Sequence, residues 1–329
     1  MKKIFLFAVA AMVSLSSCVQ TDEVYTGKVD EIGFKSAAVR GIIDTQADFK
    51  YPIAVSAVWD NPNDGIDKYV VRFDQAKFVY DEDANNWRGE TPYYWPNAGN
   101  MNFLAFCPYP VSATITTNYN AATGKIDNML VKNISNNIKD QHDVLYSDLL
   151  SVDAPQTGAQ PLQFHHALAQ INVEFKKTSS AAEVVLNSVQ LENVFFVGNL
   201  TITPNDGAAS TASWTHAAQE FSENRFFLKS ITVTGVEDGE LAATLKPDEA
   251  YSPVPVLVIP MDHQTSMKIT YTVNGHKDVK TVDLSTYGQW EMGKKYTYKF
   301  LVNINEIFFD CVVDNWDPVD VNNGDQIII

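Results

Sequence analysis

The 329-residue sequence lacks most of the features that mark common function classes. It contains only 3 cysteines, and its 24 basic residues stand against 40 acidic ones, for a formal net charge of −16. This balance argues against a nucleic-acid partner, because phosphate binding needs clustered lysine and arginine. After the first residues, no stretch of convincing length repeats apolar residues with the period of an amphipathic helix. The sequence therefore excludes a helical fold and disfavours nucleic-acid binding.

Motifs of catalysis and cofactor binding are also missing. There is no Gly-x-Ser-x-Gly elbow and no His-Glu-x-x-His pair. The pair His165-His166 has no cysteine or second histidine pair at zinc-ligand spacing, so we expect one of the two to pack in the core. We predict no enzymatic activity, no cofactor and no metal site.

Two stretches imitate phosphate and calcium loops. "GQWEMGKK" has the glycine spacing of a P-loop, but Lys295 replaces the required Ser or Thr and a strand pattern follows, so it predicts a turn into a strand. "DEDANNWRGETP" begins like an EF-hand loop, with Asp81, Asp83 and Asn85 at alternate places. Asn86 and Pro92 then stand where that loop needs Gly and Glu, which favours a solvated hairpin tip.

The first residues have the layout of an export signal. Lys2 and Lys3 precede the apolar run Ile4 to Val13, which is too short to span a bilayer, and Ser14 to Ser17 follow. The end of this segment, "LSSC", looks like a bacterial lipobox. We therefore predict a signal peptide over 1–17 and an acylated Cys18 that anchors the protein in the outer membrane. The alternative is an ordinary cleaved signal in which Cys18 has no role.

Removal of that segment leaves a strongly acidic chain. Without Lys2 and Lys3 the basic count falls from 24 to 22 against 40 acidic residues, so the net charge becomes −18. Such a charge keeps the body of the protein in water and away from anionic headgroups. The remaining cysteines, Cys107 and Cys311, lie far apart in the sequence. They could pair in an oxidising compartment, but we favour two buried free thiols.

Period-two patterns dominate the rest of the chain. In "KYTYKFLVNI" the residues Tyr296, Tyr298 and Phe300 share one face with Val302 and Ile304, as in a half-buried strand. "QINVEFKK" and "MKITYTV" alternate in the same way, and the second runs into Asn274-Gly275, which predicts a hairpin. "VPVLVIP" is an unbroken apolar run, typical of a strand covered on both faces. The fold is therefore predicted to be all-β, made of sandwiches.

Segments without a periodic apolar pattern indicate how the chain is divided. A domain boundary is predicted within "KKTSSAAE", which gives an N-terminal domain over 41–178 and a C-terminal domain over 179–329. Residues 116–142 are rich in Asn and Thr and predict a long surface loop.

Aromatic residues offer one candidate binding surface. Most of the tryptophans are expected to pack in the core, where aromatic burial contributes most, and "TPYYWP" is the best candidate for an exposed cluster. The six tryptophans are Trp59, Trp87, Trp95, Trp214, Trp290 and Trp316.

An ordered set of segments resembles one known family. The segments "WRGETPYYWPNAGNMNFLAFCPYP", "DVLYSDLL", "PLQFHHALAQINVEF", "PVLVIP", "YGQWEMGKKYTYKFLV" and "VVDNWDP" are similar to those of fimbrillins, the type V pilins of Bacteroides-like bacteria, and of their Mfa-like branch in particular. The resemblance implies two tandem transthyretin-like, Greek-key β-sandwich domains. It also implies assembly with other pilin subunits, as a homopolymer or heteropolymer, rather than catalysis.

The resemblance further implies a removable leading strand. Such pilins are exported as lipoproteins, and an arginine-specific protease then removes the anchor with the first strand. The matching segment here is "VDEIGFKSAAVRGIID", in which Ile32 and Phe34 form the apolar side of the strand and the bond between Arg40 and Gly41 is the candidate cut. Residues 18–40 would thus carry both the lipid and the strand.

Loss of an edge strand exposes backbone groups and core side chains until another strand fills the gap. By resemblance the donor of that strand is C-terminal. The candidate residues are Val319 and Val321, followed by Ile327, Ile328 and Ile329. These residues could equally close a strand of their own domain.

Two functions follow from these observations. The first is a structural fimbrial subunit that is processed at Arg40, assembled by strand exchange and used in cell adhesion. The second is a permanently lipidated surface protein, either a pilus anchor or a module that binds glycans of a host or bacterial surface through exposed aromatic residues.

Overall fold

The structure is a computed structural model, and it describes residues 30–38, 50–62, 68–110, 113–120, 123–135, 142–177, 182–195, 197–216, 228–232, 243–246, 249–253, 255–260, 265–287, 289–302 and 307–315. Within these ranges the chain is all-β, as predicted, and the one helical turn is the 3-10 turn η5 (Ser285–Tyr287). None of the described helical structure has the length and apolar character needed to cross a membrane.

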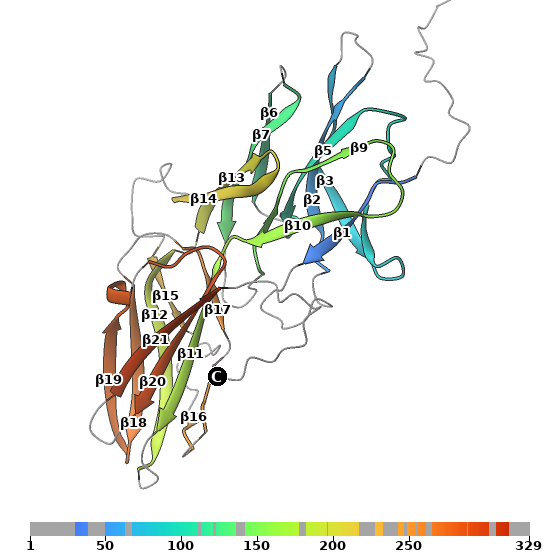
Figure 1. Cartoon of the computed structure of the whole chain (residues 1–329). Coiled ribbons are helices and arrows are strands. Elements are labelled where there is room, and N and C mark those ends of the chain that lie inside the picture. Colours follow the sequence, from blue (N-terminus) through green and yellow to red (C-terminus); the bar gives the residue numbers. More distant parts are fainter. Residues whose placement is uncertain are drawn as a thin grey trace, which may run out of the picture.

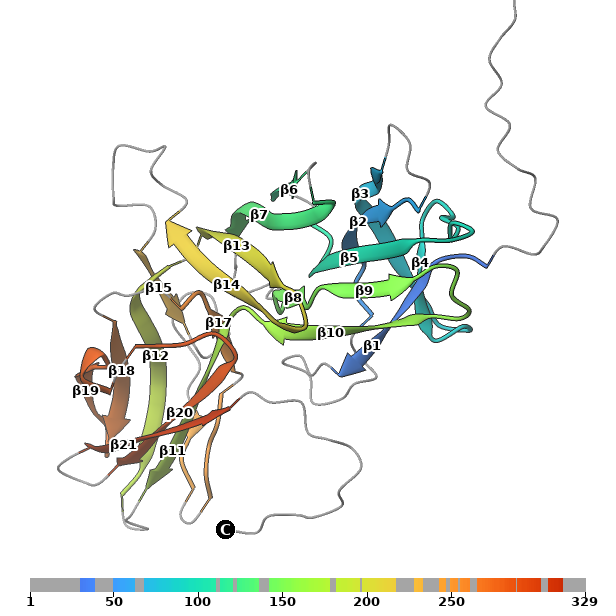
Figure 2. The same cartoon turned by 45° about the horizontal axis from the view of Figure 1, so that its top comes forward.

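The N-terminal part of the chain forms a closed ring of seven strands. Going round the ring the order is β2, β3, β4, β1, β10, β8 and β5, and the pairing of β5 with β2 closes it, while β9 extends from β5. Figures 1 and 2 show this barrel-like sheet at one end of the molecule. Its strands are β1 (Gly33–Ala38), β2 (Ile53–Asp60), β3 (Tyr69–Asp81), β4 (Asn86–Gly89), β5 (Asn100–Cys107), β8 (Leu145–Ser147), β9 (Leu150–Asp153) and β10 (Gln160–His166).

A second sheet joins segments from both halves of the sequence. It has the order β14-β13-β7-β6, with strands β6 (Thr114–Asn120), β7 (Lys125–Ser135), β13 (Val197–Asn205) and β14 (Ala208–His216). The prediction of a long surface loop over 116–142 was wrong, because β6 and β7 form a hairpin there with Thr114 opposite Lys132. Thr117 lies on the buried face of β6, and this polar residue interrupts the apolar alternation that would have indicated a strand.

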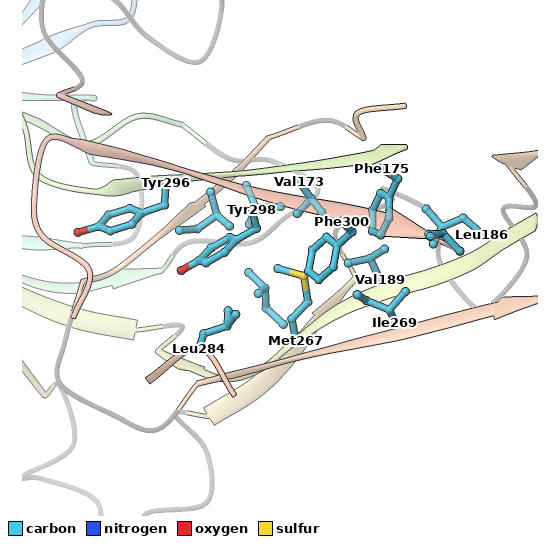
Figure 3. Packing of buried hydrophobic residues seen from close by; sticks show 14 of the residues in the cluster. Val173, Phe175, Leu186, Val189, Met267, Ile269, Leu284, Tyr296, Tyr298 and Phe300 are labelled. Atoms are coloured by element: carbon cyan, nitrogen blue, oxygen red, sulfur yellow. The ribbon is translucent and has the colours of Figure 1, made fainter. Parts of the chain in front are cut away.

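The C-terminal part is built from two sheets that pack face to face. One has the order β17-β11-β20-β21 and the other β15-β12-β18-β19, with β16 paired to β12. Figure 3 shows side chains of both sheets meeting in one core, among them Phe175, Phe300 and Met267. The strands are β11 (Ala169–Lys177), β12 (Val184–Phe195), β15 (Leu228–Thr232), β16 (Ala243–Thr244), β17 (Val256–Val258), β18 (Ser266–Val273), β19 (His276–Asp283), β20 (Lys294–Val302) and β21 (Ile307–Asn315).

The period-two predictions hold for these strands. Tyr296, Tyr298, Phe300 and Val302 of β20 are all buried, and the intervening Lys299 is exposed. β18 and β19 form the predicted hairpin, since Asn274 and Gly275 have φ values of 48° and 82° and so supply the two positive-φ positions of the turn. Periodicity thus located these strands correctly.

The predicted division at residue 178 remains a prediction, and the hydrogen bonding adds facts that bear on it. β11 precedes that point but pairs with β17 and β20, which follow it. β13 and β14 follow that point but join β7. A core cluster accordingly combines Leu104 and Phe106 with Leu200 and Leu257, so the two halves of the sequence share one packed interior.

Candidate functional site

The candidate site is the slot that β1 occupies in the barrel. β1 lies between β4 and β10, as Figure 2 shows, and it is antiparallel to β4 and parallel to β10. Phe34 stands opposite Trp87 of β4 and Gln160 of β10. Because the ring closes through β1, taking this strand away would leave β4 and β10 with unpaired backbone groups. The slot is therefore a continuous site for a single strand.

Ile32, which directly precedes β1, and Phe34 within it both face the barrel core. Ile32 is 1% exposed and Phe34 0% exposed. The ring of Phe34 makes edge contacts with Phe78 at 5.0 Å and Phe103 at 5.2 Å between centroids. Edge-to-face geometry suits the aromatic quadrupole and adds to the gain from burial. Phe34 is thus a central member of this core.

The start of β1 has additional backbone contacts. The amide of Ile32 donates to the carbonyl of Tyr93 at 2.7 Å, and the amide of Trp95 donates to the carbonyl of Asp30 at 3.4 Å. Glu31 also forms a bridge with Tyr94. The pairing with β4 covers Gly33 and Phe34, whereas the pairing with β10 continues to Ala38. The start of β1 is therefore hydrogen-bonded to strands on both of its edges, and the rest of β1 pairs with β10.

The walls of the slot include residues that the sequence analysis did not single out. Phe78 of β3 and Phe103 of β5 lie 25 residues apart in the chain, and both rings contact that of Phe34 because β3 and β5 pair with the two edges of β2 in the barrel. The apolar residues at alternate positions of "NMNFLAFC" are a signal that could have assigned Phe103 to a core-facing side. The sequence had no signal that its neighbour would be Phe34.

The predicted exposed aromatic cluster is largely buried. Trp95 is 3% exposed and packs its ring on Phe103, and Tyr93 packs on Phe73 and Phe78. Only Tyr94, at 52%, is exposed. The prediction for "TPYYWP" was wrong because the backbone of this segment is hydrogen-bonded to residues 30–32, and Tyr93 and Trp95 pack into the core beside them.

The other described tryptophans confirm the expectation of core packing. Trp87 and Trp290 are buried, and Trp59 and Trp214 pack against core clusters while their indole N–H groups donate to the carbonyls of Ala98 and Ala167. Trp316 lies outside the described residues.

The buried histidine belongs to a structural pair. His166 is buried, as expected for one of the two histidines, and its Nδ1 lies 2.5 Å from Oδ2 of Asp143. Burial raises the pKa of the Asp143 carboxyl, and the charge and hydrogen bond of His166 oppose that rise. His165 lies 2.9 Å from Asp148. No group of three or more metal-binding side chains occurs among the residues that the structure describes.

The two segments that resemble calcium and phosphate loops in sequence, "DEDANNWRGETP" and "GQWEMGKK", form the turns that were predicted for them. The Oδ1 of Asp81 accepts from the amides of Asp83 and Ala84, which makes the turn between β3 and β4 a hairpin tip. Gly293 has a positive φ of 67° in the turn that leads into β20. Cys107 is a buried free thiol, and burial raises its pKa, with the nearby charge of Asp143 adding to the effect.

The structure describes one predicted site only by its backbone and several others not at all. Cys311 is in β21 opposite Tyr298, with only its backbone pairing described. The candidate anchor, cut and donor strand lie in ranges without structural description, so they stay predictions: Cys18, Arg40, Gly41, Val319, Val321, Ile327, Ile328 and Ile329.

Comparison with known proteins places these features in context. A model of a family described as fimbrillin-like matches residues 40–316. No curated protein matches the chain. A fimbrial protein from Bacteroides vulgatus has 16% identity and a TM-score of 0.51, covering 87% of this chain and 99% of its own.

Two candidate cell adhesion proteins have similar structures. The one from Bacteroides ovatus has 14% identity and a TM-score of 0.53, with 89% of this chain and 100% of its own covered. The one from Bacteroides uniformis has 15% identity and a TM-score of 0.50, with 88% and 97% covered. At such identities these likenesses show a common fold.

Proposed function

The chain belongs to the fimbrillin-like family, and from this premise we propose that it is a subunit of a cell-surface fimbrium that supports cell adhesion. In this proposal the chain is exported as a lipoprotein through Cys18 and is displayed on the outer membrane. A protease cuts after Arg40 and releases residues 18–40 with β1. A strand of another pilin subunit, for which the C-terminal segment is the candidate, then fills the slot. The protein has no catalytic role.

The placement of β1 is the observation that carries this proposal. It is the first described strand, it lies just before Arg40, and it completes the barrel with two fully buried apolar side chains. Its loss would expose Phe78 and Phe103 to water together with the edges of β4 and β10, a state that strongly favours addition of a new strand. Head-to-tail contacts of this kind do not close on themselves and so form filaments.

Two further observations support the proposal. The family match begins at residue 40 and leaves β1 outside it, which fits a mature protein that starts near Gly41. The tandem transthyretin-like, Greek-key description of the family is part of the proposal for this chain, and the face-to-face sheets of the C-terminal part agree with one such sandwich.

The test is made on the bacterium that produces the protein. Fimbriae sheared from its surface are analysed by N-terminal sequencing and by electrophoresis without boiling. We expect Gly41 as the first residue and a ladder of heat-resistant polymers that contain the chain. In an Arg40→Ala variant the chain stays at precursor length and leaves the ladder, whereas Lys35→Ala, a neighbouring loss of one positive charge, leaves both unchanged.

An acylated Cys18 as the first residue of the surface protein would refute the processing step. That result would instead identify the chain as a permanently lipidated anchor subunit. The glycan-binding alternative has lost its main candidate surface, because Tyr93 and Trp95 pack into the barrel core.

A further inference from the structure

The backbone of the leading strand is held mainly at its first residues. Residues 30–34 are bonded to three separate parts of the chain. Backbone hydrogen bonds join residues 30–32 to residues 93–95, and Gly33 and Phe34 pair with β4. Phe34 also pairs with β10. This part of the strand therefore has backbone partners in three segments that lie far from it in the sequence.

The same residues carry the buried apolar side chains. Ile32 is 1% exposed and Phe34 is 0% exposed. The ring of Phe34 lies 5.0 Å from that of Phe78 and 5.2 Å from that of Phe103 between centroids. Removing such side chains from water is a large favourable contribution to the attachment of a strand. Residues 30–34 thus supply both the apolar contacts and most of the backbone pairing.

The second half of β1 has fewer partners. In the described part of the chain, β4 pairs with the start of β1 and with none of residues 35–38. The pairing of this half with β10 includes Pro161, which has no N–H to donate, and it shifts register between Ser36 and Ala38. The buried hydroxyl of Ser36 has no hydrogen-bond partner among the described residues, which disfavours the paired state. Residues 35–38 therefore hold the strand less firmly than residues 30–34.

The cut in the proposed function breaks a single covalent bond. Hydrolysis between Arg40 and Gly41 consumes one water and leaves a carboxylate on Arg40 and an amino group on Gly41. The contacts of residues 30–34 lie earlier in the chain and do not depend on that bond. An empty slot would expose Phe78 and Phe103 together with the edges of β4 and β10. The slot that favours an incoming strand therefore favours β1 for the same reason.

From this geometry we propose that β1 stays in its slot after the cut, as a separate peptide held by residues 30–34, and leaves only when an incoming strand displaces it. The inference rests on the proposed function and adds how its central step is controlled. Displacement begins at residues 35–38, where β1 has the fewest partners. Because Cys18 lies on the same fragment, its lipid keeps the cut subunit on the membrane until the slot receives a new strand.

The first test uses the whole chain that follows the signal peptide. It carries Cys18→Ser and a recognition site for a sequence-specific protease, inserted between Arg40 and Gly41. After complete cleavage the sample is passed through a size-exclusion column, and the fractions are analysed by mass spectrometry. We expect the fragment that contains β1 to elute with the body of the protein. Separate elution of the fragment would overturn the inference, whether or not the body then aggregates.

Two matched variants of this chain test which residues hold the fragment. Circular dichroism first confirms that each uncut variant is folded, and the fraction of fragment retained is then measured at a series of dilutions. Phe34→Ala removes a buried ring and should raise the dissociation constant of the fragment at least about a hundredfold. Lys35→Ala removes an exposed side chain of the same strand and should leave it unchanged. Equal retention in the two variants would overturn the inference.

Competing peptides test the displacement step without a variant of β1. The cut chain is mixed with a peptide of residues 30–40, and mass spectrometry follows the rate at which the original, longer fragment leaves. We expect this rate to rise with peptide concentration. A peptide of residues 34–40 keeps Phe34 but lacks the bonds of residues 30–33, so it should act at least about tenfold more slowly. A rate independent of peptide concentration, or equal action of the two peptides, would overturn the inference.

Hydrogen exchange of the uncut chain tests where displacement begins. The amides of residues 35–38 should have protection factors at least about tenfold lower than those of residues 32–34. Equal protection of the two halves would refute entry of the new strand at residues 35–38.

Measurements on cells separate this inference from the proposed function. Where Arg40 is processed, we expect cut chain outside the fimbriae to stay in the membrane fraction together with its fragment. Cut monomer in the medium would overturn the inference and leave the fimbrial role intact. An uncut Arg40 on fimbriated cells would instead refute the proposed processing, and the retention of β1 measured on the purified chain would still stand.

Discussion

Replacing Phe34 by alanine is the most direct measure of how much the barrel depends on β1. The side chain is fully buried, and its ring makes edge contacts with Phe78 and Phe103. Truncation of a buried Phe to Ala typically costs about 3–5 kcal/mol, because burial is lost and a cavity remains. Each edge contact adds about 0.5–1.5 kcal/mol beyond burial. We therefore expect the upper part of that range.

The assay must report on the barrel separately from the C-terminal sandwich. Hydrogen exchange followed by mass spectrometry gives the opening free energies of β4 and β10 in the intact chain, and urea unfolding gives the total. Phe34→Ala should speed exchange in β4 and β10 while leaving β18 and β20 unchanged. Lys35→Ala, in the same strand but exposed, is the matched control and should change neither.

A loss below about 0.5 kcal/mol at Phe34, within the range of ordinary surface substitutions, would contradict this reasoning. It would mean that the barrel keeps its stability with an incomplete β1. β1 would then contribute little to the stability of the barrel, and its removal would not favour the binding of another strand.

Three further predictions concern other parts of the molecule. Phe300→Ala should destabilise the C-terminal sandwich by about 3–5 kcal/mol in thermal unfolding, because its ring stacks on Phe175 at 5.0 Å, while exposed Leu301→Ala should be close to neutral. Burial and a hydrogen bond to the carboxylate of Asp74 raise the pKa of Tyr119 above its ordinary value of 10.0. The tyrosine therefore loses its proton at lower pH in the unfolded chain than in the folded one, so the free energy of unfolding should fall as pH rises beyond 10. The fall should be less steep in Tyr119→Phe, which has no phenol proton to lose. With the other two cysteines replaced by serine, Cys107 should react with maleimide only after unfolding, since its thiol is buried and its pKa raised; labelling of the native chain would refute this.

Local pattern was sufficient for strands whose two faces differ clearly. The alternation in β20 and the Asn274-Gly275 turn were identified from sequence because each depends on neighbouring residues only. β6 was missed because its buried face contains Thr117, whose hydroxyl is paired with that of Ser56 on β2. The neighbouring sequence does not show that Thr117 is buried, because its hydrogen-bond partner lies far away in the chain. The segment therefore resembled a loop.

The leading strand was predicted more completely than the site that holds it. Ile32 and Phe34 were assigned to one side of this strand through the resemblance to fimbrillins, and both side chains are buried in the structure. The closing of the ring could not be predicted, because β1 pairs in parallel with a strand more than a hundred residues away, and only the fold determines that register. The pairing of Gly33 and Phe34 with Arg88 and Trp87 of β4 depends on the fold in the same way.

The sheet that unites β7 with β13 determines how the molecule responds to tension. In this sheet β7, from the first half of the chain, is hydrogen-bonded to β13, from the second half, and one core cluster combines apolar side chains of the barrel, this sheet and the sandwich. Within the described residues, a load applied across one subunit is therefore carried by this packed core and by the strand pairing between the two halves of the chain. Extension of a fibre built from such units would come from the junctions between subunits, and each unit would keep its length until that central sheet ruptures.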